Sequence, residues 1–158
     1  MDIYIKDIKQ QFIFRTSAFI LNKDKSKVLL FNVEGRSIYL LPGGKVQFGE
    51  NSLDAITREL NEELNLDMDK MDFSYLGLSE EFVKDSNDYL SQHINIIYKV
   101  IYNGEVLETR FKGKEGSWIN FEWIDIDKLD NYRLHPRNIK EMTLNLDKTY
   151  HIIEDLRD

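Results

Sequence analysis

Three carboxylates at close spacing are the residues of this chain best suited to chemistry. Glu59, Glu62 and Glu63 lie in the run Arg58-Glu59-Leu60-Asn61-Glu62-Glu63. On a helix they would share an arc of about 100°, where like charges cost roughly 0.2–0.5 kcal/mol per pair. A divalent cation would reverse that cost. Oxygen ligands in a chain without cysteine favour a hard cation, Mg²⁺ first and Mn²⁺ second.

A glycine-containing segment comes directly before these carboxylates. It runs Leu41-Pro42-Gly43-Gly44-Lys45-Val46-Gln47-Phe48-Gly49-Glu50. Glycine lets the backbone approach a ligand closely, and proline fixes its own backbone angle, so the segment is predicted to be a loop. Gly43 and Gly44 are therefore candidate substrate-binding positions, and the Gly44 carbonyl is a candidate metal ligand.

The loop and the charged run together resemble the signature box of the Nudix hydrolases. Gly44, five residues, Glu50, seven residues and then Arg58-Glu59-Leu60-Asn61-Glu62-Glu63-Leu64-Asn65-Leu66 reproduce every charged position of that box. The one departure is Asn65, where the family usually has glycine. Asparagine tolerates the left-handed conformation that closes many helices, and we expect Asn65 to adopt it without loss of catalysis.

The resemblance implies both a fold and an activity. The fold is an α/β (α+β) sandwich with a mixed sheet between helices. The activity is hydrolysis of a nucleoside diphosphate linked to another moiety, assisted by Mg²⁺. Glu59 and Glu63 are expected to be the principal metal ligands, with Glu62 as a third ligand or a water-bridged neighbour. Arg58 is expected to orient a carboxylate of the box, such as Glu50.

Weaker similarities outside the box add further candidates. Gly113-Lys114-Glu115-Gly116 resembles a segment that supplies an extra acid in MutT-type members, so Glu115 is either an additional metal ligand or general base, or an ordinary solvated loop residue. Tyr39 resembles the aromatic residue with which the family's loop begins. Its ring would either stack on a nucleobase or pack against other side chains of the protein. Arg15 would contact substrate phosphate or act as an edge-strand charge. His93 and His135 have no evident partner and are expected to be structural.

The elements that must position these residues follow from hydrophobic spacing. Leu53, Ile56, Leu60 and Leu64 recur at helical spacing, so residues 51–65 are predicted to form a helix that Asn51 caps. A second helix is predicted over residues 136–146, with Pro136 in its first turn. Runs of β-branched and aromatic residues predict strands, the first two forming a hairpin, over residues 11–21, 28–33, 38–41, 73–82, 93–102 and 117–126.

Composition limits the classes of partner. The 158 residues show no linker or repeat, so we expect a single domain over residues 1–158. With 21 basic and 28 acidic residues the net charge is −7, which disfavours a nucleic-acid polymer or a membrane surface as partner. The absence of cysteine, of a leader and of a long apolar run fits a cytoplasmic protein.

The substrate itself is left open by the motifs. A standard, oxidised or otherwise non-standard nucleoside triphosphate, cleaved to a monophosphate and pyrophosphate, is favoured over ADP-ribose or a nucleotide sugar. A Nudix-fold sensor that binds a small-molecule nucleotide without hydrolysing it is the alternative from another class. A homodimer is expected only because dimers are frequent in the family. Substrate choice is expected to depend on residues 83–92, 103–116 and 131–138, which carry no recognisable motif.

Overall fold

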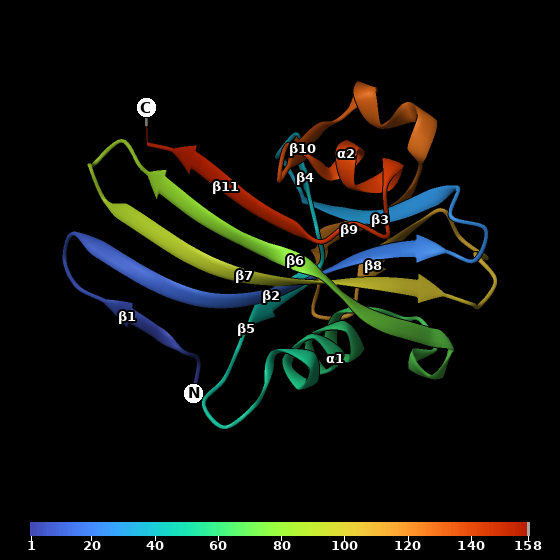
Figure 1. The fold of residues 1–158 in the computed structure, drawn as a ribbon, viewed down its shortest axis with the longest axis horizontal. Coiled ribbons are helices and arrows are strands. Elements are labelled where there is room, and N and C mark those ends of the chain that lie inside the picture. Colours follow the sequence, from blue (N-terminus) through green and yellow to red (C-terminus); the bar gives the residue numbers. More distant parts are fainter. Residues whose placement is uncertain (158) are drawn as a thin grey trace.

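The computed structural model describes residues 1–157, without the side chain of Tyr4. Within this part the chain forms eleven strands, two α-helices and two short 3-10 helices (Figure 1). The helices are α1 (Ser52–Glu63) and α2 (Ile139–Leu144), with 3-10 turns at Met68–Lys70 and Ile126–Asn131. The strands are β1 (Tyr4–Lys6), β2 (Gln10–Asn22), β3 (Lys27–Val33), β4 (Ile38–Leu40), β5 (Gly43–Lys45), β6 (Met71–Lys84), β7 (Leu90–Tyr102), β8 (Arg110–Gly113), β9 (Gly116–Asp125), β10 (Arg133–His135) and β11 (Tyr150–Leu156).

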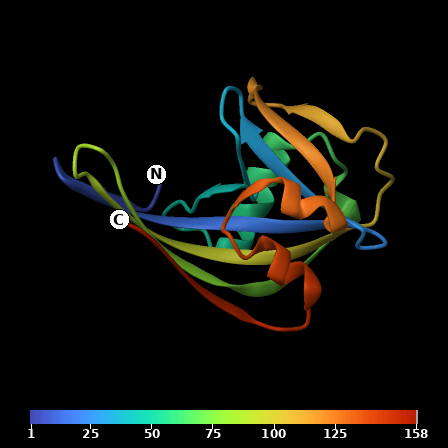
Figure 2. The same cartoon turned by 90° about the horizontal axis from the view of Figure 1, so that it is seen from above.

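The strands form a mixed sheet with helices on both sides. Its main path is β10-β4-β3-β2-β7-β6-β11. The pairs β2–β7, β6–β11 and β4–β10 are parallel, whereas the predicted hairpin β2–β3 and the pair β6–β7 are antiparallel. Helices α1 and α2 cover opposite faces of this sheet (Figure 2). The expected sandwich with a mixed sheet between helices is therefore confirmed.

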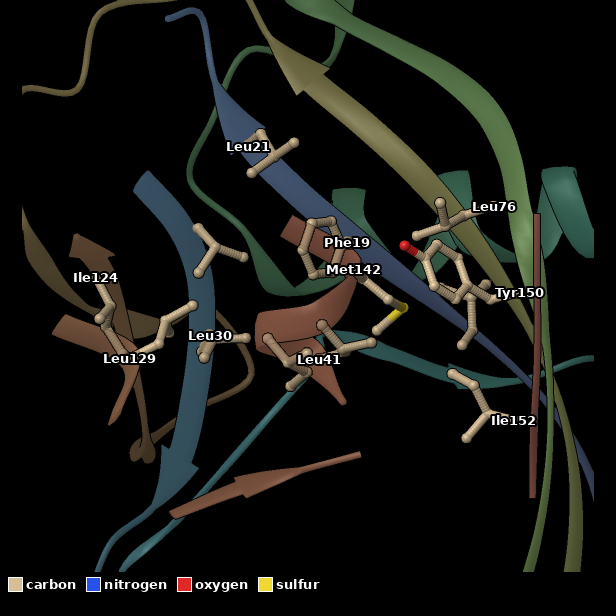
Figure 3. Packing of buried hydrophobic residues seen from close by; sticks show 13 residues of the cluster. Phe19, Leu21, Leu30, Leu41, Leu76, Ile124, Leu129, Met142, Tyr150 and Ile152 are labelled. Atoms are coloured by element: carbon tan, nitrogen blue, oxygen red, sulfur yellow. The ribbon is translucent and has the colours of Figure 1, made fainter. Parts of the chain in front are cut away.

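Strand β2 is buried on both faces, which explains its nearly continuous apolar sequence. Ala18 and Ile20 pack with the apolar stripe of α1, whereas Phe19 and Leu21 contribute to the cluster that includes Met142 of α2. Figure 3 shows this second cluster. Alternate β2 side chains thus anchor a helix on each face of the sheet.

Helix α1 begins as the sequence predicts but ends differently. The side chain of Asn51 accepts a hydrogen bond from the Asp54 amide at 2.9 Å and donates to the Asp54 carboxylate at 2.8 Å. At the other end Leu64 takes an extended conformation (φ −101°, ψ 142°) and its amide donates a hydrogen bond to the Leu60 carbonyl at 2.8 Å. Asn65 is not among the described residues with positive φ. The expected left-handed closure at Asn65 is wrong, because the chain leaves the helix directly in an extended conformation.

The segment that was expected to be a loop contains a short strand. Residues of β5 pair with β2, with Gly43 opposite Ser17 and Gly44 opposite Thr16. A Cβ atom on Gly43 would lie only 2.1 Å from the Thr16 carbonyl oxygen. The glycine therefore allows this short strand to approach the backbone of β2, instead of serving only a turn.

Towards the C-terminus the structure also departs from expectation. Helix α2 starts at Ile139 after Asn138, so Pro136 does not lie in its first turn. Strand β11 was not predicted; it pairs in parallel with β6 and alternates buried and exposed residues over most of its length. In Figure 1 the long strands β2, β6, β7 and β11 project well beyond the helices, towards the two chain ends. No helix within residues 1–157 is long and apolar enough to span a membrane.

Candidate active site

Arg58 lies at the centre of the charged group on α1. Its Nε and Nη2 donate to the two carboxylate oxygens of Glu50 at 3.1 and 2.7 Å, a bidentate pair. Nη1 donates to Glu59 at 2.8 Å, and Nη2 also reaches the Lys45 carbonyl at 3.1 Å. Arg58 therefore fixes the end of the loop relative to the helix. The expectation that it orients Glu50 agrees with this geometry.

Glu59 lies directly against Gly44 of β5. A Cβ atom at position 44 would fall 2.2–2.4 Å from the three atoms of the Glu59 carboxylate group. No side chain larger than hydrogen fits there while Glu59 keeps its position. The glycine thus places a main-chain segment beside the carboxylate, as expected if the Gly44 carbonyl and Glu59 bind one ligand.

The turn between β8 and β9 brings Glu115 to the same site. The Lys114 amide donates to the Glu63 carbonyl at 3.0 Å, and Lys114 Nζ donates to the Asn61 carbonyl at 3.0 Å. In addition to burial, the charge of Glu115 raises the pKa of both Glu59 and Glu63. A residue 52 positions after Glu63 in the sequence is therefore an electrostatic neighbour of the box.

Burial and like charge make these carboxylates unusual acids. Burial is the main cause that raises the pKa of Glu63 to about 8, and the charges of Glu59 and Glu115 add to it. The pKa of Glu59 is also raised, first by burial. In contrast, the hydrogen bond from Arg58 holds the pKa of Glu50 below its usual value. Glu50 is thus a stable anion, while Glu59 and Glu63 lie where additional positive charge would be favourable.

The oxygen donors of the site suit a hard divalent cation, but their side chains are not grouped as ligands of one. No three acidic or histidine side chains in residues 1–157 are already grouped closely enough to hold an ion. Glu59 faces Arg58, and Glu62 is more exposed, with 44% of its side chain accessible and a 3.5 Å contact to Arg58. Binding would therefore require Glu59 and Glu62 to turn from Arg58. The oxygen-only donors, the crowded negative charge and the Gly44 backbone suit such an ion.

The structure also places the other substrate-binding candidates. Arg15 lies on β2 between β5 and β7, so the edge-strand interpretation is wrong. Its positive charge lowers the pKa of Glu63 and so partly offsets the effects of burial and of the acids. Tyr39 donates from its hydroxyl to Glu122 at 3.1 Å, and its ring contacts Tyr132 edge-on. Gly43 is buried against β2.

A second ionisable cluster was missed in the sequence. Buried Glu81 of β6 lies 3.2 Å from His135 Nε2 and 3.5 Å from His93 Nδ1. Hydrogen bonds from the two histidines outweigh burial and lower the pKa of Glu81 to about 2, and Glu81 raises the pKa of His135. The structure thus gives the two histidines a shared partner, where the sequence indicated none. The pairing of β6 with β7 places His93 opposite Glu81, whereas His135 comes from β10, which pairs only with β4 among the described strands, so tertiary packing completes the cluster.

Comparison with known proteins agrees with this geometry. The NUDIX domain matches residues 13–146, which is most of the chain. The chain belongs to the Nudix hydrolase family. The match extends beyond the box to all the strands that surround the carboxylate helix, except for the two terminal strands β1 and β11.

Relatives of this Nudix protein include enzymes named for action on RNA. It is 36% identical over 75 residues to an RNA pyrophosphohydrolase of Ruthia magnifica, covering 47% of this chain and 41% of that protein. It is 28% identical over 153 residues to the m7GpppN-mRNA hydrolase of Saccharomyces cerevisiae, covering 91% of this chain but only 14% of that protein. It is 25% identical to the uncharacterized Nudix hydrolase YvcI of Bacillus subtilis, covering 79% of this chain and 74% of that protein. The chain thus spans well under two thirds of the first two relatives.

Solved structures support the same fold. A MutT protein from Bacillus halodurans superposes with a TM-score of 0.65 at 19% identity, covering 92% of this chain and 90% of that chain. A Nudix-family hydrolase from Clostridium perfringens gives a TM-score of 0.61 at 19% identity, covering 85% and 97%. At these identities the likeness shows the fold alone.

Proposed function

We propose that this Nudix protein is a Mg²⁺-dependent pyrophosphohydrolase that cleaves a nucleoside diphosphate linked to another moiety. The preferred substrate class is a nucleoside 5′-triphosphate end, standard or modified, from which a monophosphate end and pyrophosphate are released. The observation that carries the proposal is the charge coupling of Glu59, Glu63 and Glu115, with the Glu59 carboxylate directly against Gly44. Like charges beside partly buried carboxylates such as Glu59 and Glu63 are costly unless a cation or a proton compensates them.

The substrate's chemistry explains why these residues are needed. A diphosphate bridge repels a nucleophile because of its negative charge. Glu59, Glu62, Glu63 and the Gly44 carbonyl would hold Mg²⁺, which supplies positive charge to the phosphate oxygens. Arg58, fixed by Glu50, keeps the helix and loop in one arrangement. Water then adds to a phosphorus atom, the bridging P–O bond breaks, and a Glu115 carboxylate oxygen accepts a proton from the attacking water.

The proposal is tested by hydrolysis of a substrate panel. Initial rates with Mg²⁺ and Mn²⁺ would be compared for nucleoside triphosphates, 5′-triphosphorylated RNA, ADP-ribose, sugar nucleotides and dinucleoside polyphosphates. We expect release of a monophosphate product from a triphosphate end. Glu63→Gln should lower kcat at least about 100-fold, equivalent to about 2.7 kcal/mol.

The matched control is Glu34→Gln, which removes an exposed carboxylate on the loop after β3. This variant should retain full activity. Retention of full activity in Glu63→Gln would overturn the assigned mechanism. A nucleotide that raises the melting temperature but is never hydrolysed would instead support a Nudix-fold sensor. Preferential cleavage of ADP-ribose would correct the substrate class and leave the metal site in place.

A further inference from the structure

Strand β11 is an open edge of the sheet. It is the last strand of the main path and pairs only with β6 among the described strands. No described residue outside this pair hydrogen-bonds its main chain over residues 150–156. In Figure 1 it forms the outer border of the long strands that project beyond the helices. Its seven residues therefore form an edge with unpaired main-chain groups, which can accept another strand.

The exposed side chains of β11 do not protect this edge in the usual way. Residues 150, 152 and 154 are buried, whereas His151, Ile153 and Asp155 are exposed. Ile153, at the centre of the strand, has 65% of its surface accessible. Edge strands that stay unpaired commonly carry a charge at such a position. Strand β11 also lies outside residues 13–146, which match the NUDIX domain, so family membership does not account for this exposed residue.

A second copy of the same edge is a suitable partner strand. Two copies related by a two-fold axis pair in antiparallel orientation, and each contact then occurs twice. With the axis at Ile153, this residue lies opposite its own copy, and His151 lies opposite Asp155 of the second copy. Directly opposite residues of an antiparallel pair lie on the same face, close enough for their side chains to interact. The interface would thus be apolar at its centre and polar on both sides.

The polar groups on the two sides of Ile153 are complementary. His151 Nε2 contacts Glu80 at 2.7 Å, and no described residue hydrogen-bonds its Nδ1. The Asp155 carboxylate accepts hydrogen bonds from Arg157 of its own chain and has lone pairs left for a further donor. The imidazole of one copy can therefore donate to the carboxylate of the other, at both ends of the interface.

The neighbouring registers lack this complementarity. An axis at Ile152 places His151 opposite Ile153 of the second copy and leaves Asp155 without a donor. An axis at Glu154 places this carboxylate opposite its own copy, where like charges repel. The side chains of β11 therefore favour the register centred on Ile153.

We propose that β11 pairs with β11 of a second copy of this chain, antiparallel and centred on Ile153, so that the sheets of two protomers form one continuous sheet. The partner is a second copy because the edge complements itself. Two seven-residue strands bury less area than a standard interface, so the dimer forms at micromolar concentration. Strands β6 and β7 separate β11 from β2, which pairs with the strand of Gly44. Each protomer thus keeps its own carboxylate site, and the inference does not depend on the proposed function.

Sedimentation velocity over a range of concentrations tests the interface. We expect wild type to change from monomer to dimer between about 1 and about 500 µM. His151→Glu and Asp155→Lys should each raise the dissociation constant about tenfold, because a complementary pair is lost twice in one interface. The double variant again places a carboxylate opposite a cation, and it should return the dissociation constant to within about threefold of wild type.

A disulfide tests the register, because the chain contains no cysteine. In Ile153→Cys the two thiols would face each other across the axis, at a Cα separation that a disulfide can span. Mild oxidation should therefore link this variant into a covalent dimer. Leu156→Cys is the matched control on the same strand. Its two copies would lie six residues apart along the paired strands, about 20 Å, and should stay unlinked.

A charge control and the melting temperatures exclude simpler explanations. Glu108→Lys makes the same change of charge at an exposed position before β8 and should leave the dissociation constant unchanged. Melting temperatures confirm that each variant is folded. A wild type that stays monomeric up to about 500 µM would overturn the inference and point to a strand of another protein instead. Equal effects of Asp155→Lys and Glu108→Lys, or equal oxidation of the two cysteine variants, would show that the copies meet elsewhere and would also overturn it.

Discussion

At the scale of single residues, Arg58 serves two carboxylates that differ in acidity. Its hydrogen bond keeps the pKa of Glu50 low, so Glu50 remains an ionised partner across the neutral pH range. Burial raises the pKa of Glu59 despite its contact with the same guanidinium group. Glu50 therefore fixes Arg58, and Glu59 is the member of the pair that a cation could recruit. An Arg58→Lys variant would lose this difference between Glu50 and Glu59, because an ammonium group cannot form the bidentate pair with Glu50.

Gly44→Ala tests the close approach of the backbone to Glu59. The added methyl group would lie 2.2–2.4 Å from the Glu59 carboxylate, so this side chain must move. We expect kcat to fall by about tenfold or more, while the melting temperature changes little because the displaced group is a side chain. Initial rates and thermal unfolding measure both effects.

The control for this substitution is Gly35→Ala. Gly35 has a φ of 81°, and a methyl group added there would meet nothing within 4 Å, so the alanine variant should lose about 1 kcal/mol of stability but no activity. Wild-type activity in Gly44→Ala would contradict the assigned contact between Gly44 and Glu59.

The residues of the box can be predicted because the side chains that act together lie close to one another in the sequence. The spacing of Glu59, Glu62 and Glu63 is enough by itself to indicate a shared helix face. Glu81 carries no such signal, because its partners His93 and His135 lie 12 and 54 positions away and on other strands. The contact with His93 depends on the register of β6 and β7, and the contact with His135 depends on how β10 packs, and residue spacing in the sequence reveals neither.

At the scale of elements, two buried carboxylates attach β10 and the segment after it to the long sheet. Glu81 bonds to His135 at the end of β10, and Glu154 of β11 accepts bonds from the Arg137 amide at 2.9 Å and Nε at 3.0 Å. Apolar contacts of Ile139 and Met142 complete the attachment. The short helix α2 is therefore held by ionic and apolar contacts rather than by its own length.

Stability should depend on pH through Glu81. Its pKa is about 2 in the fold against an ordinary value of 4.5, so its stabilisation is present above pH 4.5 and is lost as the pH falls towards 2. The pKa of His135 is raised above 6.5, so the same contact weakens as the pH rises through that raised value. Urea unfolding should show the largest cost of Glu81→Gln near pH 5.5, up to about 3 kcal/mol.

The neighbouring residue supplies the control for this pH dependence. Glu80 bonds to His151 at 2.7 Å, but both side chains are partly exposed, at 33% and 58%. Glu80→Gln should therefore cost less than about 1 kcal/mol at every pH. Equal pH profiles for the two variants would show that burial of Glu81 is not the cause.

Of the short strands only β4 was predicted, whereas the strands β2, β3, β6, β7 and β9 all were, and the difference has a physical reason. Strands β2, β3, β6, β7 and β9 each contain enough β-branched and aromatic residues to indicate a strand alone. Short strands such as β5 and β10 form only because a neighbouring strand offers backbone partners, Thr16 for Gly44 and Tyr39 for Leu134. In β11 a buried charge, Glu154, interrupts the apolar alternation of Tyr150 and Ile152.

At the scale of the whole molecule, the net charge of −7 suggests that phosphate groups are repelled, but the positions of the charges give a different result. Four of the acids, Glu50, Glu59, Glu62 and Glu63, belong to one site, where a divalent cation would offset them. The cations Arg110 and Lys112 line a separate cavity on strands β3, β8 and β9. The total charge therefore does not indicate whether a phosphate-bearing substrate can bind, because the positions of the charges decide this.

Thermal unfolding should detect the binding of Mg²⁺ directly. Mg²⁺ at ten times its dissociation constant should raise Tm by about 3–6 °C, because it binds the folded state preferentially. The shift should disappear in Glu59→Gln and Glu63→Gln and persist in Glu34→Gln. NaCl at equal ionic strength is the comparison, since it screens charge without binding specifically. An equal rise with NaCl would show general screening instead of a site.

The parallel pairing of β2 with β7 affects how the chain can assemble during its synthesis. Every residue of β2 pairs with one 80 positions later, and β6 must wait for β11 at the C-terminus. Helix α1 is complete in the nascent chain once Glu63 has been added, yet the sheet beneath it lacks a central strand until Tyr102 follows. Distant pairings of this kind slow folding. A ribosome must therefore release Glu115 from its exit tunnel before the carboxylate site can exist.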